Sequence, residues 1–286
     1  MLPLATSLLE PLRGDFGLPT AIELMLVGAS CGGIGVWVVQ FSRAFLAESF
    51  THALLPGLVI ATIAGTSLVL GALIGIALAY VATLAVERTP RMSPSSGTSV
   101  VVTGLVAAGA LLATVGDAPV RLEPLLFGDP LATSDSDLAL ALGLAAALAA
   151  ALFVMHNAFT ACAFDRGAAS GLGIRTAATN AVLVLLVVLA VAVAANVAGS
   201  LLALALVTGP ALGALQIGRR IGPAIALSAA FGGACGVIGM YVSYFADWPL
   251  AASVALSAAL LPATIAGAVR LRRLKPAVPA ARAAGL

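Results

Sequence analysis

Charged residues are scarce in this sequence, and their scarcity excludes a soluble fold. Asp, Glu, Lys and Arg make up 9% of the 286 residues, whereas hydrophobic residues make up 61%. An average soluble chain carries roughly 25% charged residues. A soluble globule of this size has no interior large enough to hide so much apolar surface. The composition therefore predicts an all-α polytopic membrane protein.

Cysteine and histidine are also rare. Cys31, Cys162 and Cys235 stand in apolar or small-residue surroundings, with no C-x-x-C pair and no zinc-finger spacing, so we expect them to be packing residues. Of the two histidines, His156 precedes Asn157 at the end of an apolar run, where we expect an interfacial capping role. The other, His52, lies within an apolar stretch.

Runs of about 20 apolar residues, the length that crosses a hydrocarbon core, recur along the chain. They predict nine membrane spans, and because 44–65 carries two ionisable residues a count of eight stays open. Gly-, Pro- and Ser-rich breaks such as 87–97, 116–130 and 218–223 separate the runs. The predicted spans are 19–41, 44–65, 67–86, 98–116, 137–157, 177–195, 198–216, 221–246 and 249–270.

The basic residues predict the orientation. Alternating spans place twelve Lys and Arg residues on one side and only Arg13 and Arg121 on the other. Basic residues favour the cytoplasmic side, so we expect a cytoplasmic carboxyl terminus and, with nine spans, an external amino terminus. The first 18 residues lack the features of a signal peptide. We therefore expect a short extracellular or interfacial segment at 1–18, a permease domain at 19–275 and a cytoplasmic tail at 276–286.

Acidic residues gather on the predicted outer side. They fit ordinary loop solubility, a mouth that attracts cations or a docking surface for a basic partner. They are Glu10, Asp15, Glu23, Asp117, Glu123, Asp129, Asp135, Asp137 and Asp247.

Small residues recur at helical spacing. Pairs such as Gly28 and Gly32 or Gly71 and Gly75 let helices approach closely in lipid, so we expect them to pack helices. The glycine-rich run at 28–35 lacks the Lys-Ser/Thr ending of a phosphate loop, so we predict no nucleotide site in this chain.

The stretch LAESFTHALLPGLV (46–59) carries the chemistry. Glu48 and His52 stand four residues apart and therefore share one face of a helix. A carboxylate and an imidazole suit divalent Mn, Fe or Zn, although the pair also fits a hydrogen bond that joins two helices. Two ligands are too few for a selective site, and a symmetry-related copy would supply four. Pro56 and Gly57 predict a kink that shapes the pathway.

Four segments, in order, resemble the metal-ion (manganese, zinc and iron) permease family of ATP-binding cassette importers. ESFTHALLPG (48–57) is similar to the family's D-x-x-S-H-A-V-L-P-G. EPLLFGDPLATS (123–134), AFDRGAASGLGI (163–174) and VTGPALGALQIGRR (207–220) are similar to three later family segments. Two departures stand out: Glu48 replaces the usual Asp, and Gly167 stands where the third segment usually has Glu.

The resemblance implies a homodimeric permease that moves a divalent Mn, Zn or Fe ion along its shared axis. Two cytoplasmic ATPase subunits would hydrolyse ATP, and an extracellular metal-binding protein would deliver the ion. Glu48 and His52 of both copies would meet the ion. The segment 163–174 would couple the permease to the ATPase. Its residues singled out for this role are Phe164, Asp165, Arg166, Ala169, Leu172, Gly173 and Ile174.

Other functions remain open at this stage. A related permease for an iron chelate or cobalamin would share the coupling segment, but a bulky ligand would not need Glu48 and His52. A secondary metal transporter would need no ATPase. An intramembrane metalloprotease is disfavoured because the sequence has no H-E-x-x-H helix. We expect membrane lipid as a partner, no nucleic acid, no catalytic activity of the chain itself and no permanently bound cofactor.

Overall fold

The computed structural model describes residues 10–12, 17–66, 68–87, 94–115, 135–198 and 200–274, and this part of the chain is helical with no strand. Within these described residues a short 3-10 helix, η1 (Glu10–Leu12), precedes ten α-helices. They are α2 (Gly17–Gln40), α3 (Ala44–Ile63), α4 (Leu68–Glu87), α5 (Pro94–Val115), α7 (Asp135–Phe164), α8 (Arg166–Gly171), α9 (Thr176–Ala198), α10 (Ser200–Ile217), α11 (Ile221–Ala246) and α12 (Leu250–Leu274). Each of the nine predicted spans overlaps one long helix of this set.

Six of the described helices are long and apolar enough to cross a membrane. Two shorter apolar stretches, Ile74–Val86 and Leu202–Ile217, lie in α4 and α10. The six are Gly17–Gln40, Ser96–Val115, Leu138–Phe164, Thr176–Ala194, Ile221–Ala246 and Leu250–Leu271. The chain is thus a multi-pass membrane protein.

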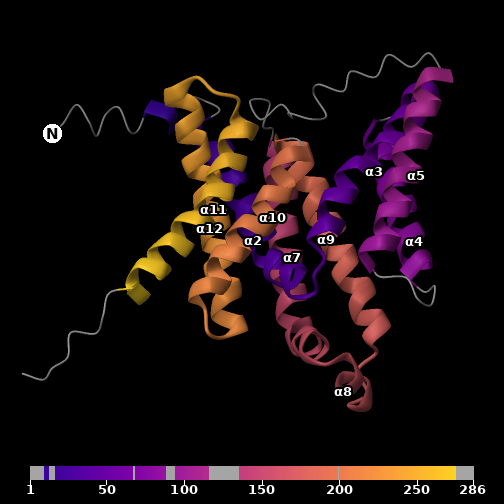
Figure 1. The fold of residues 1–286 in the computed structure, drawn as a ribbon. Helices are drawn as coiled ribbons and strands as arrows, with labels where there is room; N and C mark the ends of the chain where they lie inside the picture. The colour runs from indigo at the N-terminus through magenta and orange to yellow at the C-terminus, as the bar shows by residue number, and fades with distance from the viewer. Residues whose placement is uncertain are drawn as a thin grey trace, which may run out of the picture.

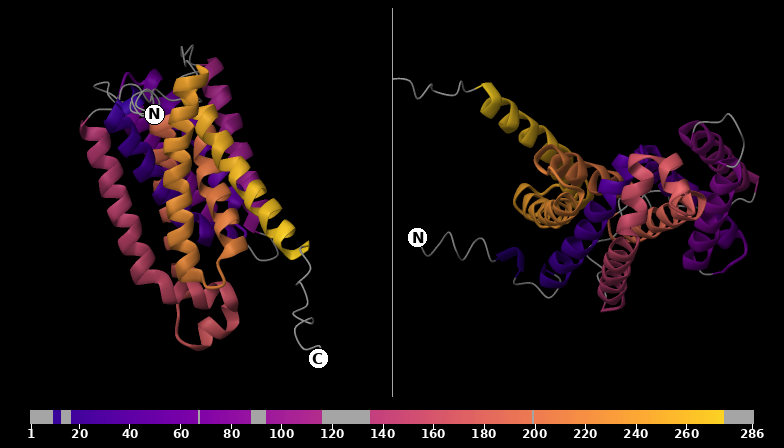
Figure 2. Two further views of the ribbon diagram at one scale, coloured as in Figure 1. Left: turned by 90° about the vertical axis from the view of Figure 1, so that its left-hand side faces the viewer. Right: turned by 90° about the horizontal axis from the view of Figure 1, so that it is seen from below.

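Helix α2 lies at the centre of the bundle. It packs against α11, α10, α7 and α9, while α3, α4 and α5 form a second group beside α9 and α10 (Figure 1). The gold helices α11 and α12 lie on the opposite side from α4 and α5, as the view from below also shows (Figure 2).

Small residues allow the closest helix contacts. Gly28 faces the backbone of Gly232, and Ser228 donates a hydrogen bond to the carbonyl oxygen of Gly32, so α2 and α11 nearly touch. Gly209 meets Ala258 in the same way between α10 and α12. The prediction that these glycines pack helices is confirmed, and the three cysteines are buried and free, as predicted.

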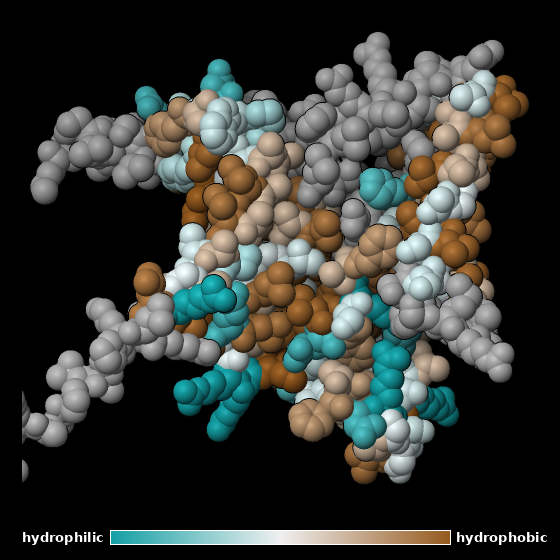
Figure 3. All heavy atoms as spheres, in the orientation of Figure 1, coloured by the Kyte–Doolittle hydropathy of each residue, from teal (hydrophilic) through white to brown (hydrophobic). Residues whose placement is uncertain are grey.

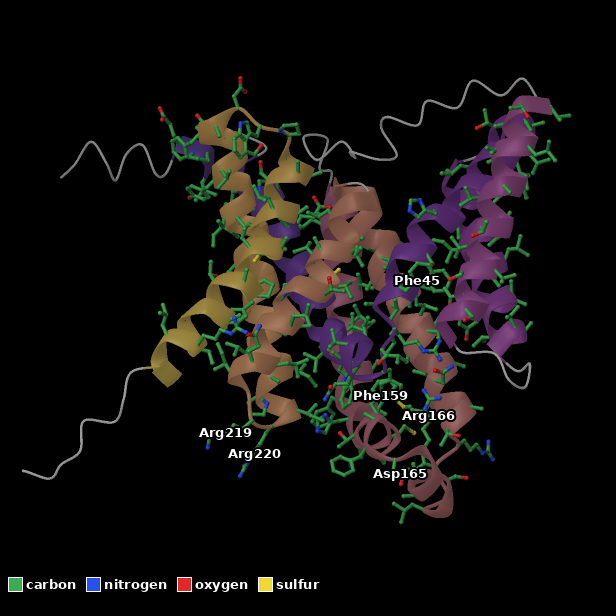
Figure 4. The ribbon with its side chains drawn as sticks, viewed as in Figure 1. Phe45, Phe159, Asp165, Arg166, Arg219 and Arg220 are labelled. Atoms are coloured by element: carbon green, nitrogen blue, oxygen red, sulfur yellow. The ribbon has the colours of Figure 1, made fainter. Side chains whose placement is uncertain are left out.

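Polar residues gather toward one end of the bundle. Asp165 and Arg166 lie at the lower end in Figure 4, and Arg219 and Arg220 lie at a separate place on the same end; Figure 3 shows hydrophilic residues there, below a largely hydrophobic middle. Helix α11 runs for 26 residues from Ile221 to Ala246, roughly 39 Å at 1.5 Å per residue. Asp247 therefore lies near the opposite end from Arg220.

Candidate functional site

Helix α3 carries the predicted ion ligands. It runs without a break from Ala44 to Ile63, with Pro56 inside it. Glu48 and His52 therefore stand one turn apart on a single continuous helix. The Ser49 hydroxyl donates a hydrogen bond to the carbonyl oxygen of Phe45 at 2.7 Å, so this hydroxyl finds its hydrogen-bond partner within α3.

Several side chains of α3 are exposed in the single chain. Phe45, His52, Ile60 and Ile63 are all exposed, and their spacing of seven, eight and three residues places them on one side of the helix. Ser49, Pro56 and Val59 lie on the same side and are buried. Figure 4 marks Phe45 near the beginning of this helix. His52 is thus an exposed polar side chain of α3, with the buried Ser49 and Pro56 on the same side of the helix.

Other side chains of α3 are packed inside the protomer. Leu46, Phe50 and Ala53 are buried in the hydrophobic core. Gly57 lies against α4, where a Cβ atom would overlap the carbonyl oxygen of Gly71 and the backbone of Gly75. Gly57 therefore packs against Gly71 and Gly75, the pair that the sequence predicted to pack helices. Whether Pro56 and Gly57 also shape a pathway stays a prediction.

The predicted coupling segment forms the short helix α8 and its two ends. Asp165 caps it, because its carboxylate accepts hydrogen bonds from the backbone N–H groups of Gly167 at 2.7 Å and Ala168 at 3.1 Å. Gly173 ends it in the left-handed region with φ of 80°, and the N–H of Ile174 donates to the carbonyl oxygen of Ala169. The helix therefore forms with Gly167 in place of the family's Glu.

Exposure divides the residues of this segment into two groups. Phe164 is 93% exposed and Leu172 is 77% exposed, so both apolar side chains project from the end of the bundle. Ala169 is buried and Ile174 is half-buried, which holds the helix against its neighbours. The segment leaves two apolar side chains uncovered in the single chain, and Figure 4 labels Asp165 and Arg166 near its start.

Two sequence expectations need correction. His156 does not cap a helix end, because α7 continues to Phe164, and the imidazole packs edge-on against Trp37 with ring centroids 5.9 Å apart. Glu23 is only 2% exposed within α2, so it does not belong to an outer acidic surface. Arg43, one of the twelve basic residues placed on the cytoplasmic side, lies in the turn between α2 and α3, where it is buried and donates to the side-chain oxygen of Asn180 at 2.8 Å. The sequence did not predict this burial.

Sequence reasoning missed a cluster beside the coupling segment. Phe41 packs against Trp37 and Phe159, and Arg166 lies over its ring. For the neighbouring Arg43, the only signal in the sequence was its position between two apolar runs, and that position also fits an ordinary charged residue of a loop.

The segment 123–134 and the tail 276–286 lie outside the described residues.

The described side chains of one protomer do not complete a metal site. Among them, no three His, Cys, Asp or Glu residues gather closely enough to hold an ion. That Glu48 and His52 bind an ion stays a prediction.

Comparisons with known proteins agree with these features. The manganese transport system membrane protein MntC of Halalkalibacterium halodurans is 30% identical over 83% of this chain and 82% of its own length. A probable iron transport system membrane protein of Haemophilus influenzae is 24% identical over 87% of this chain and 92% of its own. PsaBC from Streptococcus pneumoniae, solved in complex with Fab, has the same fold, with a TM-score of 0.78, 23% identity and coverage of 93% of this chain and 95% of that chain.

The match to a family covers most of the sequence. Residues 15–266 match the ABC 3 transport family, a range that contains every long helix except the last turns of α12. The chain therefore belongs to the ABC 3 transport family.

Proposed function

We propose that this chain is the membrane-spanning permease subunit of an ATP-binding cassette importer for a divalent transition-metal ion. Manganese and iron are the first candidates, because the names of the relatives mention these two metals. Two copies of the chain would form the pathway, with one α3 from each copy at the shared axis. Glu48 and His52 of both copies would bind the ion in transit.

The observation that carries this proposal is the exposed side chain of His52 on the apolar helix α3. A polar group in a membrane helix is costly unless it lines a pathway or meets a partner. Two copies facing each other would supply two carboxylates and two imidazoles, a ligand set that suits Mn, Fe or Zn. A single copy would leave the site open.

Energy would come from separate ATPase subunits. Phe164 and Leu172 project from the end of the bundle that also carries Arg219 and Arg220. Two exposed apolar side chains on a short capped helix fit an apolar groove on a cytoplasmic partner. The chain itself would bind no nucleotide, and an extracellular metal-binding protein would deliver the ion.

The iron-chelate or cobalamin importer is less well supported. Its bulky ligand needs no carboxylate and imidazole on the axis, and the names of the relatives cited above mention manganese and iron. A secondary transporter is also disfavoured, because it has no use for a segment that presents Phe164 and Leu172 to a partner.

The test is the metal content of the purified permease after separate loading with Mn, Fe and Zn. We expect one ion per two chains for the wild type and at least a tenfold loss in the Glu48→Gln/His52→Ala double variant. His156→Phe is the matched control, because it removes the other histidine but keeps a ring against Trp37. Equal metal in the double variant and the wild type would remove α3 from the ion site.

A further inference from the structure

The turn between α2 and α3 is tightly built. The N–H of Arg43 donates to the carbonyl oxygen of Val38 at 2.7 Å, and Ser42 adopts a left-handed conformation with φ of 55°. This pattern ends α2 as a Schellman motif does, with Ser42 where glycine is usual. Arg43 then precedes the first residue of α3, so the position of the turn sets where α3 begins.

Helix α9 holds this turn from one side. The guanidinium of Arg43 is buried, with the residue 4% exposed, and donates to the side-chain oxygen of Asn180 at 2.8 Å. Asn180 is the fifth residue of α9, which follows α8 after only four residues. The next residue, Ala181, accepts a hydrogen bond from the Tyr80 hydroxyl of α4 at 3.3 Å. The beginning of α9 thus contacts both the start of α3 and its packing partner α4.

Helix α8 and the end of α7 hold the turn from a second side. The guanidinium carbon of Arg166 lies 5.8 Å from the centroid of the Phe41 ring, within the range of a cation–π contact. Phe159 of α7 packs edge-on against the same ring at 6.2 Å. The first residue of α8 therefore contacts the turn directly, without an intervening helix.

We propose that residues 41–43 form a mechanical link that passes movement of α8 and α9 to α3. The proposal rests on the proposed function, in which an ATPase moves α8 and the ion meets α3. Glu48 and His52 follow Arg43 by five and nine residues on one unbroken helix. A displacement of the turn would therefore shift both ion ligands together. Arg43 and Phe41 are positioning residues in this scheme and do not touch the ion.

A purely structural role makes a different prediction. If Arg43 and Asn180 only stabilise the fold, their loss lowers thermal stability but leaves the number of ions moved per ATP unchanged. If they transmit movement, the ratio of ions to ATP falls while the folded protein still binds its ion. The two roles separate when metal content, ATPase rate and transport are measured on the same reconstituted complex.

The first variants are Arg43→Gln and Arg43→Lys in the permease reconstituted with its ATPase in liposomes. We expect Arg43→Gln to keep one ion per two chains while ions moved per ATP fall about tenfold. Arg43→Lys should recover at least half of the lost coupling, since its ammonium still donates to Asn180. Arg219→Gln is the control, an exposed arginine at the same end of the bundle. A wild-type ratio in Arg43→Gln would overturn the proposal.

A second pair of variants tests the proposal even if Arg43→Gln fails to fold. Phe41→Leu and Arg166→Gln each remove one side of the cation–π contact, and Arg166 is exposed, so its loss leaves the core intact. We expect a twofold to fourfold loss of coupling in each and no further loss in the double variant. Additive losses would show that the two residues act separately, against the proposal. A wild-type complex that neither binds nor transports the ion would instead refute the proposed function.

Discussion

At the residue scale, spacing in the sequence predicts which side chains share a face when both residues lie on one helix. Glu48 and His52 stand four apart in the sequence, so their place on one helix could be predicted without the structure. The sequence could not predict which residues of another helix a given residue contacts. Gly57 was interpreted as part of a kink, whereas the structure places it against Gly71 and Gly75 of α4. Sequence spacing does not encode which two helices cross, so contacts of this kind need the fold.

The close crossing of α3 and α4 makes a prediction at Gly57. Gly57→Ala adds a methyl group that would overlap the backbone of Gly71, and overpacking of this kind costs about 1–3 kcal/mol. We expect the thermal unfolding midpoint of the purified protein in detergent to fall by several degrees.

The matched control for Gly57 is Gly104→Ala in α5. A Cβ atom at Gly104 meets nothing within 4 Å, so the added methyl group lies in open space. Alanine is also the better helix former, by about 1 kcal/mol. The control should therefore keep or raise the midpoint. Equal midpoints for Gly57→Ala and Gly104→Ala would show that the crossing tolerates a side chain.

At the element scale, the helices were predictable because apolar runs and breakers coincide with their limits. The run at 137–157 is the exception, since α7 continues to Phe164. The sequence AFTACAF (158–164) contains no Gly or Pro, and the next helix-ending signal is the capping carboxylate of Asp165. A membrane span and a helix need not end together, and the extra two turns carry α7 as far as α8.

Helix α8 supplies the prediction at this scale. Leu172→Asp replaces an exposed apolar contact by a charge that an apolar groove would exclude. We expect the ATPase to copurify at less than a tenth of the wild-type amount, while the permease keeps its bound ion and its thermal stability. Leu172→Met is the control, because it keeps an apolar side chain of similar size. Full copurification of the ATPase with Leu172→Asp would place the contact elsewhere.

At the scale of the whole molecule, the sequence indicated an assembly that one chain cannot show. The ligand count suggested a second copy, and such a copy would cover the exposed side chains of α3, His52 among them. The bundle also groups Arg166, Arg219 and Arg220 at one end, as the alternation of spans predicted. What the sequence could not provide is the face of each helix that meets the partner, because hydropathy alone does not separate lipid from a second apolar protein surface.

Cross-linking tests whether α3 lines the dimer axis. In a background with the three buried native cysteines replaced by alanine, His52→Cys would bring two thiols near the axis. Two imidazoles on one ion hold their backbones too far apart for a direct disulfide, which needs Cα atoms within about 7 Å. A short bifunctional thiol reagent should therefore convert more than half of the His52→Cys protein to a covalent dimer. Phe153→Cys, exposed on α7, is the control and should stay monomeric on a denaturing gel. The reverse pattern would move the axis from α3 to α7, and the ion ligands would then have to be sought on that helix.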